Sequence, residues 1–341
     1  MAKIKVQDIA DHVGTSRVTV WKALNNKEGV SDKLKQRIIE TADSMGYFDN
    51  DVYKGDNDNK PSKTVALLIS RPDSSNFWLQ IIHQLAKTLS KENVDLLYSY
   101  LPSKISEQYV LPTNLYDGTV DAAIVINVYS SKLLGKINSL KIPKIFLDLS
   151  PDIENDRING DLLFIEGKNA VYRLTQKLLK LGKSRIAFVG DIFYAKTNLS
   201  RYEGYKIAFN EVKKELPNIS LLGPIPIDSY NITIRQYLDK FNGHFPEAFV
   251  CSSDHIAYYI EEYFQENNIP RKDNIILTGF DNNKEYRSIA GKISTVAVDT
   301  SAIGDILANK ILFRLEHENI INEISYVSFP VIFRGQLKDN N

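Results

Sequence analysis

Apolar positions near the N-terminus follow two short helical periods, separated by a tight Gly-Thr-Ser turn at residues 14–16. The buried positions of these periods are Ile9, Val13, Val20, Ala23 and Leu24. This spacing predicts a helix-turn-helix, whose second helix can lie in a DNA major groove. The opposite face of that second helix carries cations, an amide and an apolar surface, namely Arg17, Val18, Trp21, Lys22 and Asn25. Such groups contact phosphates, base edges and thymine methyls. The alternative is a solvated helix of an ordinary bundle, but an exposed Trp between basic residues argues against it.

A third helix is predicted after the helix-turn-helix. Ser31 has the residue type of an N-cap and Asp32 favours the first turn, while Gly46 ends the pattern. Its buried stripe is Leu34, Ile38, Ala42 and Met45. The polar stretch DNDVYKGDNDNKPS that follows reads as a linker. We therefore expect a DNA-binding domain over residues 1–49 and a hinge over 50–62.

From residue 63 onward, apolar runs of strand length alternate with amphipathic stretches of helix length. The predicted strands are 65–70, 94–100, 122–127, 144–149, 185–190, 247–252, 275–280 and 294–298. The predicted helices are 78–92, 170–181, 202–215, 254–268 and 301–316. Continuous apolar strands that alternate with helices are typical of parallel sheets covered on both faces. We expect an α/β core of two doubly wound parallel-sheet lobes.

Ligands of such sheets bind at the carboxyl ends of the strands. The residues predicted there are mostly amides, hydroxyls and carboxylates: Arg71 to Asn76, Asn127, Asp148, Asp191, Ser253, Asp254 and Asp281 to Asn283. This set suits a polyhydroxylated ligand better than a phosphorylated one.

Composition and charge narrow the possible classes of protein. The 341 residues are 43% hydrophobic and 25% charged, which excludes wholesale disorder. We expect no membrane span and no signal peptide. Because Cys251 is the one cysteine, we expect no intramolecular disulfide either. Together these expectations point to a cytoplasmic protein. The formal net charge is zero, so one DNA-binding module should bind weakly and we expect a homodimer.

Motifs of catalysis are absent from the sequence. The five histidines, His12, His83, His244, His255 and His317, have no metal-ligand spacing. No dinucleotide-binding, phosphate-binding or nucleophile-elbow motif occurs either. His83 and His255 fall in predicted helices, where surface or core roles are expected. We predict neither an enzyme nor a cofactor or metal requirement.

The chain resembles the lactose-repressor/galactose-repressor (LacI/GalR) family of bacterial transcription regulators over nearly its whole length. In the first module the resemblance rests on VQDIADHVGTSRVTVWKALNN and VSDKLKQRIIETADSMGY. In the core it rests on PDSSNFW, RYEGYKIAF, TGFDNN and FPVIFRG. The resemblance implies a dimer that reads a pseudo-palindromic operator, with a small-molecule effector, most simply a sugar, bound between two periplasmic-binding-protein-like lobes. The chain should cross between the lobes near Asp161, Ile293 and Ser325, so that residues 63–160 with 293–324 and 161–292 with 325–337 form the lobes.

The resemblance also assigns site residues. DNA contacts are expected from Thr15, Ser16, Arg17, Val18, Thr19, Trp21, Lys22, Asn25 and Tyr47. Trp21 departs from the small residue usual there, and packing on the linker is its alternative role. Effector contacts are expected from Asn76, Trp78, Asp148, Arg201, Tyr230, Ser253 and Asp281. Asp254 is expected to be a helix N-cap, and an ion pair of Arg201 with Asp148 or Asp281 is an alternative for the ligand-free cleft.

The hinge departs from the family pattern. Many members carry a hinge-helix leucine that wedges into the minor groove, and here Asp56 stands in its place beside Gly55. Val52 or Tyr53 could serve as the wedge instead. The function expected overall is an effector-controlled DNA-binding regulator, in the first place a repressor. The alternatives are a sugar-binding protein without a DNA role and a regulator that responds to a nucleobase or a sugar phosphate.

Overall fold

The structure of the chain is a computed structural model that describes residues 4–24, 27, 29–45, 47, 62–71, 75–226, 229–270, 275–317 and 320–338. Residues 1–61 and 62–341 form two separate compact units. In the described part of the second unit, 3-10 helices lie at Thr113–Leu115, Asn155–Arg157 and Gly335–Leu337. No helix among the described residues is long and apolar enough to cross a membrane.

The described residues of the first unit form three helices in the predicted order. They are α1 (Val6–Val13), α2 (Arg17–Leu24) and α3 (Asp32–Ser44). Their core consists of Ile9, Ala10, Val13, Val20, Ala23, Ile38 and Ala42. Gly14 ends α1 in a left-handed conformation (φ +74°), and its N–H donates to Ala10 O at 3.0 Å. The predicted helix-turn-helix therefore forms, and Ser31 holds the N-cap position of α3 without a capping side-chain bond.

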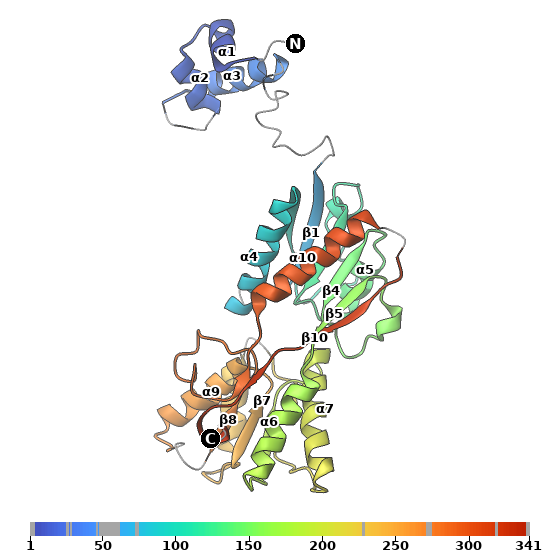
Figure 1. The fold of residues 1–341 in the computed structure, drawn as a ribbon, viewed down its shortest axis with the longest axis vertical. Coiled ribbons are helices and arrows are strands. Elements are labelled where there is room, and N and C mark those ends of the chain that lie inside the picture. Colours follow the sequence, from blue (N-terminus) through green and yellow to red (C-terminus); the bar gives the residue numbers. More distant parts are fainter. Residues whose placement is uncertain are drawn as a thin grey trace. The chain divides into compact units, whose positions relative to one another are not determined.

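A parallel six-stranded sheet, in the order β10-β5-β4-β3-β1-β2, builds the first lobe of the second unit, called the N-lobe here (Figure 1). Its strands are β1 (Lys63–Ile69), β2 (Val94–Tyr100), β3 (Ala122–Ile126), β4 (Lys144–Leu147), β5 (Asp161–Ile165) and β10 (Ile324–Val327). Alternate residues of β1 face opposite sides: Val65 and Leu67 join one core cluster, and Ala66 and Leu68 the other.

Helices cover both faces of the N-lobe sheet. α4 (Asn76–Lys91) and α10 (Thr300–Glu316) lie side by side on one face, and α5 (Ser131–Asn138) packs on the other (Figure 1). α4 and α10 approach closely at Gly304, where a Cβ would lie 2.9 Å from Ile81 O. The small residue therefore allows the two backbones to touch.

The second lobe, called the C-lobe here, is built on the parallel sheet β6-β7-β8. Its strands are β6 (Ile186–Val189), β7 (Ala248–Cys251) and β8 (Ile276–Thr278), and an antiparallel pair is formed by β9 (Thr295–Val296) and β11 (Val331–Ile332). One face is covered by α6 (Lys168–Lys180) and α7 (Lys196–Glu211), and the other by α8 (Tyr230–Asp239) and α9 (Asp254–Glu266). The expectation of an α/β core with parallel sheets is confirmed.

The predicted crossings between the lobes need correction. Asp161 begins β5 and Ser325 lies within β10, and both strands belong to the N-lobe sheet. Ile293 is part of the C-lobe core. The chain therefore crosses later than expected in each case, after Ile165, after Val296 and after Val327. The sequence pattern missed β5 and β10, because β5 begins with an acid, Asp161, and β10 is an edge strand with exposed and half-buried side chains.

Candidate functional site

The outward face of α2 in the first unit presents the predicted DNA-reading residues. Val18 is 62% exposed and Trp21 50% exposed. Arg17 is also exposed, whereas Thr19 and Lys22 are half-buried. Apolar and cationic groups are thus available on one side of a helix whose other side is fixed by the core.

The turn before α2 has a structural function as well. Ser16 Oγ accepts a hydrogen bond from Thr19 N at 3.1 Å, as an N-cap does, and lies 2.8 Å from Thr19 Oγ1. Tyr47 is half-buried and packs against the helical core. Asn25, Gly46 and the hinge residues Val52, Tyr53, Gly55 and Asp56 lie outside the described residues.

A cavity of about 180 Å³ lies between the two lobes of the second unit. Six of the seven predicted effector residues line it: Trp78, Asp148, Arg201, Tyr230, Ser253 and Asp281. Asn76, the first residue of α4, is exposed and does not line it. The carboxyl ends of the strands therefore gather these side chains from distant parts of the sequence, as expected for parallel sheets.

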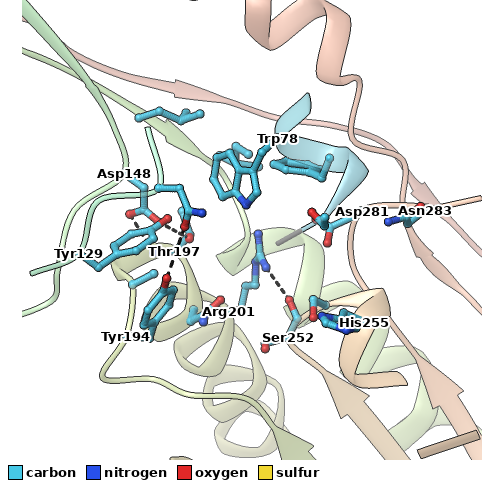
Figure 2. Close-up of a pocket in the computed structure, with 18 of the residues that line it drawn as sticks. Trp78, Tyr129, Asp148, Tyr194, Thr197, Arg201, Ser252, His255, Asp281 and Asn283 are labelled. Atoms are coloured by element: carbon cyan, nitrogen blue, oxygen red, sulfur yellow. Dashed lines mark hydrogen bonds between the residues drawn. The ribbon is translucent and has the colours of Figure 1, made fainter. Parts of the chain in front are cut away.

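Arg201 occupies the centre of this cavity (Figure 2). It comes from α7 and is buried, with its Cζ 3.6 Å from the centroid of the Phe280 ring. Its side chain passes Gly167, where a Cβ would lie 2.6 Å from Arg201 Cγ, so a larger residue would displace it. Nη1 donates to Ser252 O, while Nε is buried and has no hydrogen-bond partner among the described residues. Burial lowers the pKa of Arg201, opposed by Asp281 and Asp148.

Asp281 follows β8 and is held in an unusual backbone conformation, with φ +111°. Its N–H donates to Val296 O at 3.1 Å. Within the described part of the chain, its carboxylate accepts no hydrogen bond and forms no ion pair with Arg201. Burial raises the pKa of Asp281 to about 8, opposed by Arg201 and reinforced by Asp254. Strain and an unpaired acid together are typical of a binding site.

Asp148 differs from Asp281, because protein donors already surround its carboxylate. It accepts hydrogen bonds from Thr197 Oγ1 at 2.5 Å and from Leu149 N at 2.8 Å, with Tyr129 OH at 3.4 Å. Thr197 belongs to the first turn of α7, so this contact joins the two lobes. Burial raises the pKa of Asp148, and the hydrogen bonds from Thr197 and Leu149 oppose that rise. The ion pair considered for Arg201 is formed with neither carboxylate among the residues described.

Further contacts bridge the lobes on the same side. Lys196 N donates to Leu149 O at 2.9 Å. The Tyr194 hydroxyl accepts from Arg71 and lies 3.4 Å from Asn127 Oδ1, while its ring packs against that of Tyr129 at a tilt of 49°, with centroids 4.4 Å apart. The sequence did not predict a role for Tyr129, Tyr194 or Thr197. Their only signal is their position in loops that follow strands or begin a helix.

The opposite side of the cavity is aromatic. The ring of Trp78 packs edge-on against that of Phe77, with centroids 5.1 Å apart. His255 lies beside Ser252 in Figure 2, between the rings of Tyr230 and Tyr286. A surface or core role was expected for His255; as the second residue of α9, which begins at the cavity, it lines the cavity wall.

The N-cap of α9 is Ser253, whose Oγ accepts from Ile256 N at 3.3 Å, and not Asp254 as expected. Asp254 is buried and accepts from Thr295 Oγ1 at 2.8 Å and from Asn283 N at 2.7 Å. The loop that carries Asp281 returns to this carboxylate, so Asp254 fixes the loop rather than the helix end.

Comparisons with known proteins agree with this architecture. Residues 5–50 match the family described as bacterial regulatory proteins, lacI family, and residues 175–335 match the periplasmic binding protein-like domain. The HTH-type transcriptional regulator RegA of Clostridium saccharobutylicum is 26% identical, over 94% of this chain and 95% of its own. Catabolite control protein A of Staphylococcus epidermidis is 24% identical, over 93% and 94%. These relatives are regulators, which confirms the prediction that the chain is not an enzyme.

Solved structures share the fold. The cellobiose complex of the regulator CelR has a TM-score of 0.69 at 17% identity, covering 97% of this chain and 99% of its own. The lac repressor dimer bound to operator and the anti-inducer ONPF has a TM-score of 0.69 at 17% identity, covering 98% of both. A LacI-family regulator of Enterococcus faecium with bound ribose has a TM-score of 0.64 at 20% identity, covering 80% and 97%. The chain belongs to the LacI family of bacterial regulatory proteins and is a DNA-binding transcription regulator.

Proposed function

We propose that this regulator is a repressor whose operator affinity is controlled by a small carbohydrate bound between its lobes. The observation that carries the proposal is the pair of buried Arg201 and half-buried Asp281, which line one cavity with hydrogen-bonding capacity that the described protein groups leave unused. A buried polar group without a partner costs about 1–3 kcal/mol. A ligand that supplies both donors and acceptors, as vicinal hydroxyls do, removes this cost.

Cavity size and charge narrow the ligand class further. About 180 Å³ is below the ~300–1,000 Å³ of pockets for drug-sized ligands, which favours one sugar ring over two. Arg201 is the one cation among the described lining residues, and Asp148 and Asp281 share the cavity with it. A phosphate would meet both carboxylates, so a sugar phosphate fits less well. Trp78 offers a ring face on which a pyranose or furanose can stack.

The effector part of the proposal is tested by thermal-shift and calorimetric titration with D-ribose, D-glucose, D-galactose, cellobiose and hypoxanthine. We expect a monosaccharide to bind, and Asp281→Asn to abolish its binding while operator affinity stays unchanged. A variant that binds the sugar as tightly as the wild type would show that Asp281 lies outside the binding site. If hypoxanthine bound and none of the sugars did, the proposed effector class would change from a carbohydrate to a nucleobase.

For the DNA part, we propose that Lys22 contacts a base edge and that Arg17, Val18 and Trp21 read neighbouring positions. A binding sequence is first selected from random duplexes with the full chain. Lys22→Ala should then lower the discrimination between that sequence and random DNA by about 1–3 kcal/mol. Lys33→Ala, which removes an exposed charge of α3, is the matched control and should weaken binding to both DNAs equally. If Lys22→Ala lost the same affinity for the selected sequence and for random DNA, Lys22 would contact only phosphate. A selection that enriches no sequence would refute operator binding.

We also propose that the regulator acts as a homodimer, because two helix-turn-helix units are needed for a pseudo-palindromic site. The edge strand β2 and the adjacent α4 offer a face for a second copy, with Tyr100 57% and Leu79 47% exposed. Sedimentation should give twice the monomer mass. Leu79→Glu should shift the protein to monomers and weaken operator binding, and a wild-type monomer would contradict the proposal.

A further inference from the structure

His255 is held in a stack of rings at the wall of the cavity. Its ring plane is tilted by only 8° from that of Tyr230 and 3° from that of Tyr286, with centroids at 5.6 and 5.2 Å. Tyr259, one helical turn further along α9, closes a third side at 4.8 Å. Packing on three sides fixes the plane of the imidazole, so the direction in which its nitrogens point is fixed as well.

The hydrogen-bonding edge of this imidazole is unused by the protein. Among the residues that the structure describes, no group donates to or accepts from either ring nitrogen, although His255 is half-buried and lines the cavity. Neighbouring polar groups are engaged differently: Ser253 Oγ caps α9, and Ser252 O accepts from Arg201. Burial lowers the pKa of His255 below its ordinary 6.5, with Glu285 opposing. The ring is therefore neutral at pH 7 and offers one donor and one acceptor.

We propose that His255 is a specificity-determining residue of the effector site, whose fixed imidazole edge hydrogen-bonds a hydroxyl of the effector on the side of the cavity away from Asp148. The inference rests on the proposed carbohydrate effector and adds a requirement to it. The bound effector excludes water from the imidazole edge of His255, and a hydroxyl of the effector at this position supplies the hydrogen bond in place of water. A sugar without that hydroxyl leaves the imidazole unpaired in the occupied cavity.

The alternative role for His255 is structural, as a filler of the aromatic stack. Two substitutions separate the roles. His255→Phe keeps a flat ring between Tyr230 and Tyr286 and removes both nitrogens. His255→Gln keeps a donor and an acceptor and removes the ring. If His255 hydrogen-bonds the effector, the Phe variant loses the selectivity between sugars and the Gln variant retains part of it. If His255 only packs between the tyrosines, the order is reversed.

The experiment compares D-glucose with its 2-, 3-, 4- and 6-deoxy forms, and D-ribose with 2-deoxy-D-ribose, by calorimetry on the full chain. The Trp21→Phe background adds a fluorescence readout, because Trp21 and Trp78 are the two tryptophans. The wild type should bind one parent sugar roughly 10- to 100-fold tighter than one deoxy form. His255→Phe should bind both alike. His83→Phe, an exposed histidine of α4, is the control and should keep the wild-type preference.

The outcomes distinguish this inference from the function on which it rests. If no sugar binds the wild type, in these series or in the titration that tests the effector, the carbohydrate effector fails and this inference fails with it. If sugars bind and His255→Phe keeps the wild-type preference, or if the wild type shows no preference, the effector stands and the role of His255 is refuted. Thermal midpoints of the variants establish that each one is folded.

Discussion

Replacing Asp281 by asparagine should make the ligand-free protein more stable. The carboxylate has no hydrogen-bond donor among the described residues, and burial raises its pKa to about 8 from 3.8. The fold therefore prefers the neutral acid, whereas the unfolded chain ionises it. Asparagine has nearly the same shape, is always neutral and tolerates a positive φ as aspartate does, so the backbone strain at φ +111° is little changed.

The size of the effect follows from the two pKa values. The interval between 3.8 and about 8 corresponds, at about 1.4 kcal/mol for each tenfold change, to a ceiling of about 6 kcal/mol. The side chain is only partly buried, and solvent screening reduces the gain we expect to about 1–2 kcal/mol. Because the folded pKa is the higher one, the penalty is absent below about pH 3.8, grows as the pH rises and is complete above about pH 8.

The assay is urea unfolding of wild type and Asp281→Asn at pH 4, 6 and 8. The two midpoints should coincide at pH 4 and separate progressively towards pH 8, with the variant the more stable. Asp305→Asn is the control, because hydrogen bonds from Gln84 and Thr88 lower the pKa of Asp305 and neutralising it should not stabilise the fold. Equal or lower stability of Asp281→Asn at pH 8 would refute the inference that the Asp281 carboxylate is unpaired in the ligand-free protein.

Four further variants test packing in the lobes. Gly204→Ala should lower the free energy of unfolding, measured by urea titration, by about 1–3 kcal/mol, because its Cβ would lie 2.0 Å from Lys168 O. Gly135→Ala is the control and should be neutral or stabilising in the same titration, because its Cβ would have nothing within 4 Å. Asp161→Asn should cost about 3–5 kcal/mol, because it leaves Arg314 buried without its charge partner. The double variant Asp161→Leu with Arg314→Leu should recover most of that loss, and a double variant less stable than Asp161→Asn would show that the pair itself stabilises the lobe.

The sequence predicted those parts of the molecule that depend on local periodicity. Val20 and Ala23 define the buried face of α2, so the helix-turn-helix follows from their spacing. The apolar run Ala122–Ile126 is a buried parallel strand for the same reason. In contrast, β5 begins with Asp161, an acid that is buried only because Arg314 pairs with it from a helix 153 residues away. No local pattern shows such a partner.

The same distinction holds within the cavity. Asp148, Arg201 and Asp281 were predicted because they follow strands or match family motifs. The role of Thr197, which engages Asp148 across the lobes, depends on how the lobes pack. That of His255, which stacks with Tyr230 and Tyr286, depends on how α8, α9 and the Tyr286 loop pack within the C-lobe. Pairings between lobes are tertiary properties, so they become visible only in the folded chain.

Asymmetry between the two sides of the cleft explains how a ligand can control the lobes. On one side, protein hydrogen bonds such as Thr197 to Asp148 and Lys196 to Leu149 already join them. On the other side, no hydrogen bond among the described residues connects the start of α4, at Trp78, to the loop of Asp281. A ligand changes the balance between two states only through contacts that differ between them. A sugar bound as proposed, touching Trp78 and Asp281 together, would add the missing bridge, and its binding energy would then favour the conformation in which both residues reach it.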